Sequence, residues 1–328
     1  MTSQEDHERR EAYFVSRYLK IAEHWFHSKE RLELRDHESE ADRRCRFCGR
    51  GKPAVRFRRL AHAVADFLGN LSIISMNECD ECNTFFGVGC EDHLSKATML
   101  LRTLAGVPRK DSAESTFKDR ILGEMLRIDS RPGAVNIRVP EPNSVDDLLV
   151  DGELPETIPL RGDLRSQPYV PIEAVKAVVK FACSICPNGE LGQIQCAIDW
   201  VRGRREARFT SFPVGFAFTP GAEAAGERAS HVILVRRKDD GPEPYLWFLV
   251  QFRNFRFQVP VPFCPADVGV TWSRMEHFQS LFMPSWPRGE TTFSWLNWSG
   301  TEKVRTTWNV SHHRSQTVSI TRSGDRVS

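Results

Sequence analysis

Four of the nine cysteines in the sequence form two close pairs, each with two residues between its members. The pairs are Cys45 with Cys48 and Cys79 with Cys82. Each pair can bind a metal ion from one tight turn, and two such turns together supply the four ligands of a tetrahedral site. A site closed by four thiolates has no position left for water, so the spacing predicts a structural Zn²⁺ ion.

Two polar residues near these pairs have side chains that could take part in phosphodiester hydrolysis. His62 lies between the pairs, and Asn83 directly follows the second pair. A neutral imidazole that titrates near pH 6.5 can accept a proton from an attacking water, so His62 is the candidate general base. A packed or zinc-binding histidine is the alternative, although the four cysteines already complete the zinc sphere. Asn83 is the candidate ligand of a catalytic cation, and its alternative role is that of a helix N-cap.

A divalent cation would complete this chemistry by acting as a Lewis acid on the phosphate. Oxygen ligands favour Mg²⁺ or Mn²⁺, and Asn83 needs a further oxygen donor beside it. The nearby donors are Asp66, Asn70 and Glu91. Asn70 could instead fix the turn after His62 and orient the imidazole, a role for which Asn77 competes. The sequence leaves these assignments open.

A run of basic residues surrounds the first cysteine pair. Eight basic residues and no acidic one occur between Arg43 and Leu60, although the whole chain carries a net charge of only +2. They are Arg43, Arg44, Arg46, Arg50, Lys52, Arg56, Arg58 and Arg59. Such a run attracts phosphate, and a solvated surface without a partner is the alternative. Its position favours a nucleic-acid partner, and the candidate phosphate contacts are Arg56, Arg58, Arg59 and, further along the chain, Arg102.

The composition is that of a globular protein. In 328 residues, hydrophobic side chains make up 40% and charged ones 27%. No apolar run approaches the roughly 18 residues of a membrane helix, so no membrane partner is expected. The first residues lack the apolar stretch of a signal peptide, so we expect a cytoplasmic protein. Cysteines stay reduced in that compartment, which favours metal over disulfides for the two pairs.

The remaining pattern predicts how the chain is organised around these pairs. Residues 1–43 are expected to form a helical extension, because apolar side chains recur at spacings of three and four from Tyr13 to Phe26. The following module spans 44–127, with strands at 55–60 and 71–76, a helix after the second pair and another helix at 116–127. Residues 128–170, rich in Pro and Gly, are expected to be a linker with one or two strands.

The last part, residues 171–328, is expected to hold a pair of helices and a β-rich domain. Pro171 begins an apolar helical stripe, and a second helix should cover 191–201. Strands at 231–235, 245–250 and 255–261 predict an antiparallel sheet or small sandwich. A third pair, Cys183 and Cys186, has no partner pair, so these cysteines are expected to be buried and free.

The order of these elements resembles the HNH endonucleases, whose ββα-metal fold has a variant with a four-cysteine zinc. Between the pairs the sequence reads Ala61-His62-Ala63-Val64-Ala65-Asp66-Phe67-Leu68-Gly69-Asn70. At the second pair it reads Glu78-Cys79-Asp80-Glu81-Cys82-Asn83-Thr84-Phe85-Phe86-Gly87. A bacterial subgroup of the family has similar motifs in this order. Ala61 departs from the pattern, because many HNH proteins have an acidic metal ligand there, and Ala65 replaces the usual proline.

The resemblance implies an α+β chain in which residues 44–127 are an HNH nuclease domain. It implies metal-dependent cleavage of DNA, with His62, Asn83 and Asn70 in the site, and a role in bacterial defence against foreign DNA. The β-rich half would then serve recognition, regulation or assembly into a homo-oligomer. Ala61 supports the alternative function, a non-catalytic zinc-stabilised protein that binds nucleic acid.

Overall fold

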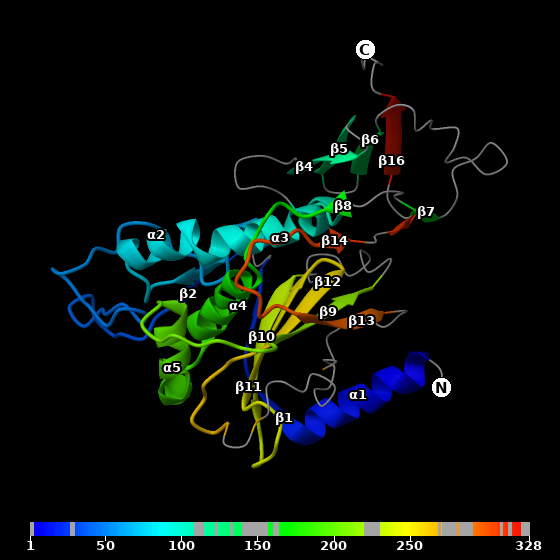
Figure 1. Cartoon of the computed structure of the whole chain (residues 1–328). Coiled ribbons are helices and arrows are strands. Elements are labelled where there is room, and N and C mark those ends of the chain that lie inside the picture. Colours follow the sequence, from blue (N-terminus) through cyan, green and yellow to red (C-terminus); the bar gives the residue numbers. More distant parts are fainter. Residues whose placement is uncertain are drawn as a thin grey trace.

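A six-stranded antiparallel sheet forms the centre of the computed structural model (Figure 1). The structure describes residues 3–26, 30–107, 115–121, 124–131, 134–139, 157–159, 164–219, 230–267, 270, 281, 291–308, 311–313 and 317–322. The strands in spatial order are β1 (Tyr18–Trp25), β10 (His231–Arg237), β11 (Leu246–Phe252), β12 (Phe255–Pro260), β9 (Pro213–Phe218) and β13 (Thr292–Asn297). The α+β class and the antiparallel sheet in the C-terminal half are therefore confirmed.

Strands β10, β11 and β12 form a meander from consecutive segments. Val232 pairs with Val250, and Val250 pairs with Phe257, so apolar residues line up across the three strands. The β-branched and aromatic residues in these segments fit a pleated surface that is buried on both faces. The hairpin and the third strand predicted from the sequence are confirmed.

Strand β1 corrects the prediction that residues 1–43 are helical. The helix α1 covers only Ser3–Arg17, and the chain then pairs with β10 as an edge strand. The pairing register shifts between Lys20 and Ala22. A bulge adds one residue on one strand, so apolar side chains around it are spaced by three or four, as they are in a helix. The bulge explains why the helical periodicity was misleading.

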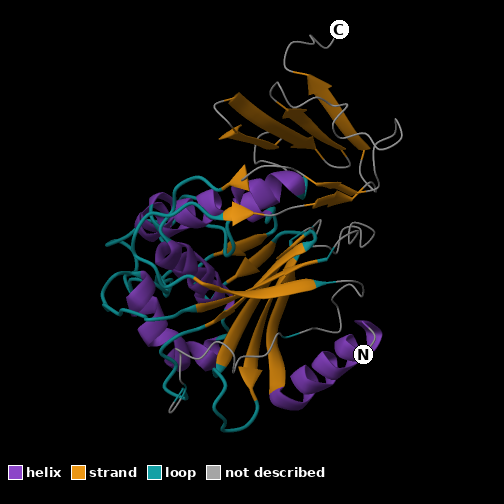
Figure 2. Ribbon diagram, turned by 45° about the vertical axis from the view of Figure 1, so that its right-hand side comes forward, coloured by secondary structure: helices purple, strands orange, loops and turns teal. Residues whose placement is uncertain are grey.

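The helices lie on both faces of this sheet (Figure 2). Helices α4 (Pro171–Ile185) and α5 (Leu191–Val201) match the predicted helix pair, and α4 packs against β11 and β12. Helix α1 lies on the opposite face, where Phe14 packs in a cluster with Ile233 and Trp247. Helix α3 (Cys90–Leu104) packs against α4, and α2 (Asp80–Val88) packs against α3. One continuous hydrophobic core runs from the paired cysteines through α3 and α4 to the sheet.

A second sheet lies beside the end of α3. Its strand order is β16 (Thr317–Arg322), β6 (Ala134–Val139), β5 (Glu124–Arg131) and β4 (Ser115–Ile121). The helix predicted at 116–127 is therefore wrong: Ser115–Ile121 and Glu124–Arg131 pair as antiparallel strands. The hydroxyl of Ser130 donates to the Thr103 carbonyl and joins this sheet to α3.

Short strand pairs extend from the predicted linker. Strand β7 (Thr157–Pro159) pairs with β15 (Ser311–His313), and β8 (Leu164–Arg165) pairs with β14 (Thr307–Trp308). These pairs connect the predicted linker with the last part of the chain. Residues 140–156, which make up much of that linker, lie outside the described residues.

His231 makes the sheet sensitive to acid. The side chain is buried on β10 beside Trp25, and neither ring nitrogen has a hydrogen-bond partner within the described part of the chain. Burial first, and then the nearby Arg256 and Lys20, lower the pKa of His231 from 6.5 to about 3. The folded state therefore keeps the imidazole neutral, whereas the unfolded chain binds a proton below pH 6.5.

We expect this histidine to lower the free energy of unfolding by about 2 kcal/mol between pH 8 and pH 5. The stability is fully present above pH 6.5 and is lost as the pH falls towards 3. A His231→Phe variant retains a ring beside Trp25 but cannot take up the proton, so it should lose less stability over that range. Urea unfolding at the two pH values measures the difference. An equal loss in both proteins would contradict the assignment.

Candidate metal centre and its surroundings

Four cysteine side chains meet at one point, as the spacing predicts. The sulfurs of Cys45, Cys48, Cys79 and Cys82 all lie within 4.8 Å of one another. The distance from Cys45 to Cys82 is 3.5 Å and the distance from Cys48 to Cys79 is 3.8 Å. Tetrahedral Zn²⁺ with Zn–S bonds of about 2.3 Å requires sulfurs roughly 3.8 Å apart. The geometry is therefore consistent with a structural zinc held by four thiolates.

The first pair sits in a tight turn. The Cys45 amide donates to the Arg50 carbonyl at 2.8 Å, and the Gly49 amide donates to the Cys45 carbonyl at 2.7 Å. Gly49 has a φ of +72°, a backbone conformation that residues other than glycine rarely adopt. The turn directs both sulfurs of the pair to the same side of the backbone, where a single ion can be bound.

The second pair lies at the start of α2. Cys79 is the residue before the helix, and its amide donates to the Cys45 sulfur at 3.4 Å. The free amides and the dipole at a helix N-terminus favour negative charge, so this end suits thiolates. Arg50, which also pairs with Glu81, acts electrostatically on Cys48. Arg202 acts likewise on Cys82, and its guanidinium lies 4.3 Å from the centre of the Phe85 ring. These two cations offset part of the net negative charge of a four-thiolate site.

His62 lies on an extended segment that pairs with a short strand. Strand β3 (Ile73–Ser75) bonds to this segment on both sides of His62: the Ala63 amide donates to the Ile73 carbonyl at 3.1 Å, and the Ser75 amide donates to the Ala61 carbonyl at 2.8 Å. Strand β2 (Leu32–Leu34) adds to the other edge of β3 in parallel. The order is thus extended segment, loop, β3 and α2.

Asn70 holds the loop between these two segments. Its side chain is fully buried, and its Nδ2 donates to the carbonyls of Val64 at 2.6 Å and Ile73 at 3.0 Å. Its Oδ1 accepts from the amides of Ser72 and Ile73. Asn70 therefore fixes the turn, the second of the two roles considered for it. Asn77, its competitor, instead accepts from the Asp36 amide at 2.9 Å.

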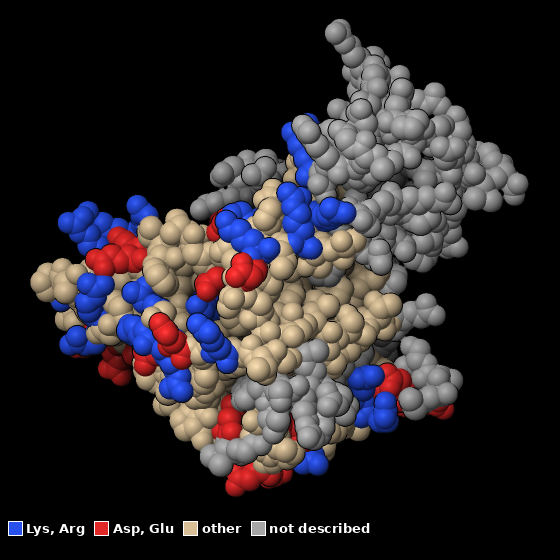
Figure 3. Space-filling model, viewed as in Figure 1, with Lys and Arg blue, Asp and Glu red and all other residues tan. Residues whose placement is uncertain are grey.

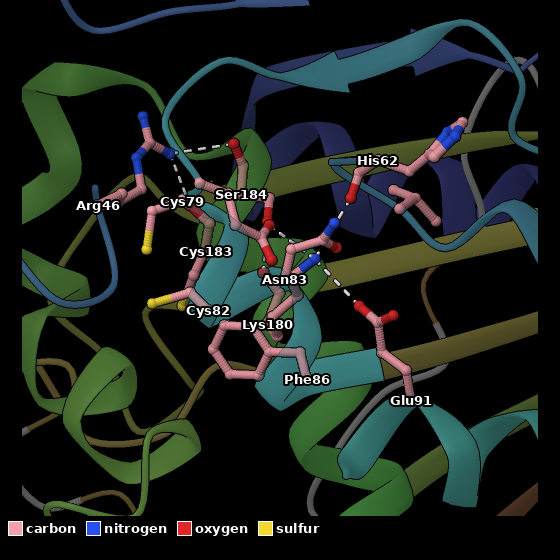
Figure 4. Close-up of polar contacts among 12 residues, drawn as sticks. Arg46, His62, Cys79, Cys82, Asn83, Phe86, Glu91, Lys180, Cys183 and Ser184 are labelled. Atoms are coloured by element: carbon pink, nitrogen blue, oxygen red, sulfur yellow. Dashed lines mark hydrogen bonds and ion pairs between the residues drawn. The ribbon is translucent and has the colours of Figure 1, made fainter. Parts of the chain in front are cut away.

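Asn83 lies in the first turn of α2, as predicted. Its Nδ2 donates to the Leu60 carbonyl over 3.5 Å, which leaves Oδ1 without a donor among the described residues. Figure 4 shows the imidazole of half-buried His62 apart from the Asn83 side chain. The two side chains therefore do not touch.

The acidic candidates occupy different environments. Asp66 begins the short 3₁₀ helix Asp66–Leu68 in the loop after His62 and is half-buried. Glu91, in the first turn of α3, lies 3.0 Å from Lys180 of α4. The same ammonium is 3.0 Å from Glu78, a buried residue that the sequence analysis did not single out. Glu91 is therefore engaged in an internal ion pair.

The basic run divides into exposed and internal side chains. Arg56, Arg58 and Arg59 are exposed, on an irregular segment where a strand was predicted at 55–60. The amides of Arg58 and Arg59 donate to one oxygen of Asp80, at 2.8 and 2.9 Å, so this segment is docked on the start of α2. Figure 3 shows Lys and Arg side chains interspersed with acidic ones at this end of the molecule.

Two arginines near this surface are structural. Arg46 donates to the carbonyls of Cys183, Ser184 and Cys186 at the end of α4. Arg102, predicted as a phosphate contact, is only 8% exposed and donates to the carbonyls of Phe67 and Ser95. Their hydrogen bonds hold the loop after His62 and the first cysteine turn in place.

No family model, curated protein or solved structure matches this chain. What the sequence and geometry establish is an α+β protein with a four-cysteine cluster that could bind zinc. The described residues include no helix long and apolar enough to cross a membrane. The assignment to the HNH family stays a prediction.

We expect a Cys79→Ser variant to lose its zinc and to unfold the region around α2. The free energy of binding a structural zinc contributes directly to the stability of the fold. Removing one thiolate leaves only three of the four zinc ligands. Metal analysis and circular dichroism of the purified proteins measure both effects. Cys196→Ser is the matched control, because Cys196 lies on α5 outside the cluster. Full zinc content in the Cys79 variant would rule out the four-thiolate site.

Proposed function

We propose that this protein is a metal-dependent endonuclease of the HNH type that hydrolyses DNA phosphodiester bonds. One observation carries the proposal. His62 lies on an extended segment paired with β3, and Asn83 lies in the first turn of a helix anchored by the cysteine cluster. This order of elements and residues is what the resemblance to the ββα-metal fold implies. A role in defence against foreign DNA rests on the resemblance alone.

His62 would serve as the general base. In an in-line displacement, the attacking water and the leaving 3′ oxygen lie on opposite sides of phosphorus. The imidazole would accept a proton from the water while the water oxygen bonds to phosphorus and the bond from phosphorus to the 3′ oxygen breaks. A separation between His62 and Asn83 suits this geometry, because the phosphate has to lie between the base and the groups that stabilise the leaving oxygen.

Asn83 and Asp66 are the residues that would hold a catalytic Mg²⁺ or Mn²⁺. Asn83 offers its Oδ1, and Asp66 supplies a carboxylate in the loop after His62. Ala61 offers no ligand, and Glu91 is paired with Lys180. Mg²⁺ is usually held by one or two protein oxygens together with substrate phosphates, so this small donor set fits it. When bound, the cation would supply Lewis-acid stabilisation of charge on the phosphate.

The exposed arginines would hold the DNA backbone. Arg56, Arg58 and Arg59 are anchored near the start of α2 through Asp80, and the Arg59 guanidinium also donates to Thr84 at 2.9 Å. Guanidinium groups bind phosphate oxygens with paired hydrogen bonds, and they neutralise charge on the phosphate. Their position beside Asn83 supports a DNA path across the start of α2.

A His62→Ala variant should keep its fold and zinc content and lose about 100-fold or more in cleavage rate, the usual contribution of a general base. The assay follows nicking of plasmid DNA with Mg²⁺ or Mn²⁺, and an excess of EDTA should abolish it in the wild type. His24→Ala, a change on β1, is the control for removing a histidine. If the His62→Ala variant cleaved DNA as fast as the wild type, another group would have to be the base.

Arg58→Ala and Arg59→Ala should each weaken DNA binding without loss of zinc. Each phosphate contact contributes about one unit to the slope of log affinity against log salt, so each variant should have a shallower slope. Fluorescence anisotropy at several salt concentrations measures the affinity. Arg9→Ala on α1 removes an exposed arginine from the other face of the sheet and should change nothing. Equal losses in all three variants would refute a local DNA surface.

A non-catalytic zinc-stabilised nucleic-acid-binding protein is the second candidate function. Two observations favour it: residue 61 is a buried alanine, and Glu91 is neutralised by Lys180. The same assays separate the two functions. Cleavage that EDTA abolishes and Mg²⁺ restores supports the nuclease, whereas salt-sensitive binding without nicking supports the binding protein.

A further inference from the structure

A lysine from the C-terminal half enters the centre of the cysteine-rich region. Lys180 lies on α4, in the apolar run from Val178 to Cys183, and its side chain is 1% exposed. Lysine is almost never buried so completely unless it is paired. The apolar stripe of α4 would accept an aliphatic residue here, so the charge requires a specific explanation.

The ammonium of Lys180 makes three polar contacts. Its Nζ lies 3.0 Å from Glu78, 3.0 Å from Glu91 and 3.3 Å from the carbonyl oxygen of His62 (Figure 4). Burial alone would lower the pKa of Lys180, but the two carboxylates outweigh it and hold that pKa above its ordinary value. The group therefore stays charged: it forms ion pairs with the two glutamates and donates one hydrogen bond to the His62 carbonyl.

These acceptors belong to the three elements that surround the proposed site. Glu78 immediately precedes the second cysteine pair, Glu91 lies in the first turn of α3, and His62 lies on the extended segment. The segment around His62 is also held by backbone bonds from Ala61 and Ala63 to β3, and by side-chain bonds from Asn83 and Asn70 to the carbonyls of Leu60 and Val64. The bond from Lys180 is made to the backbone of His62 itself, on the side that faces α4.

We propose that Lys180 is a positioning residue of the nuclease site, which sets the backbone of His62 and hence the direction of its imidazole. Glu78 and Glu91 fix the ammonium in turn. The inference rests on the proposed function and deepens it, because it makes α4 of the C-terminal half a required part of the site. A fragment that ends before α4 would keep the four cysteines and His62 but lack this contact.

Lys180→Met in the full chain tests the role, because methionine fills similar space without the charge. We expect zinc content to be retained, kcat for plasmid nicking to fall by about 10- to 100-fold, and KM to stay within twofold. Lys176→Met is the matched control, since Lys176 lies one turn earlier on α4 and pairs with Glu173 at 2.7 Å. That variant should cleave like the wild type.

A spectroscopic measurement separates this role from the proposed function. With labelled histidine, the ring resonances of His62, assigned through His62→Ala, should shift in Lys180→Met and stay unchanged in Lys176→Met. The measurement needs no DNA and no cleavage. If the wild type fails to cut DNA, the nuclease proposal falls, and the His62 resonances alone decide whether Lys180 positions that residue.

Glu91→Gln is the second variant, for use if Lys180→Met does not fold, because glutamine keeps the size of the side chain but removes the charge that pairs with the ammonium. The variant should also shift the His62 resonances and lower kcat. If both single variants fold, the variant that carries Lys180→Met and Glu91→Gln together should lose less kcat than the two separate losses combined. The two effects are not additive because both changes act on one contact. A folded, zinc-loaded Lys180 or Glu91 variant with the wild-type kcat and unchanged His62 resonances would overturn the proposal.

Discussion

The convergence of four thiolates is the constraint on which the rest of the cysteine-rich region depends. Between Cys48 and Cys79 the chain has only one short strand, β3, and one turn of 3₁₀ helix. So little regular structure could not hold its own shape in water. A shared ion would join the ends of this stretch and remove much of the freedom of the unfolded chain. The conformation of the loop that carries His62 therefore depends on the metal centre that holds its two ends together.

Charge balance explains the residues that surround this centre. Four thiolates and one Zn²⁺ would carry a net charge of −2, and Arg50 and Arg202 would offset part of it, although Arg50 also pairs with Glu81. Beside the second cysteine pair, Lys180 is paired with both Glu78 and Glu91, and burial raises the pKa of Glu78 to about 7, which lowers its negative charge. Leaving one such charge without its partner is costly in a protein interior. The region thus depends on cations from α4 and the segment after α5, far along the chain.

Short-range patterns in the sequence predicted the elements whose structure depends mainly on residues close to them in the chain. The cysteine pairs, the helix that begins after Cys79, the pair of helices after Pro171 and the β10–β11 hairpin all depend on short-range spacing and turn residues. Strand β1 could not be recognised in this way, because its bulge imitates helical spacing and its partner lies about 200 residues away. Residues 116–127 were misassigned as a helix for a related reason: their pairing partners, not their periodicity, make them strands.

The candidate site shows the same division. Asn70 and Asn83 lie where short-range spacing predicts them, in the loop after His62 and in the first turn of α2. Lys180 could not be predicted, because nothing near it in the sequence shows that it packs against the cysteine-rich region; the only local signal is a charged residue in an apolar stripe of α4. The continuous core across α3 and α4 makes that contact possible. A boundary drawn between a nuclease domain and a β-rich domain would cut through this core, and the region around His62 is better described as a joint product of both halves.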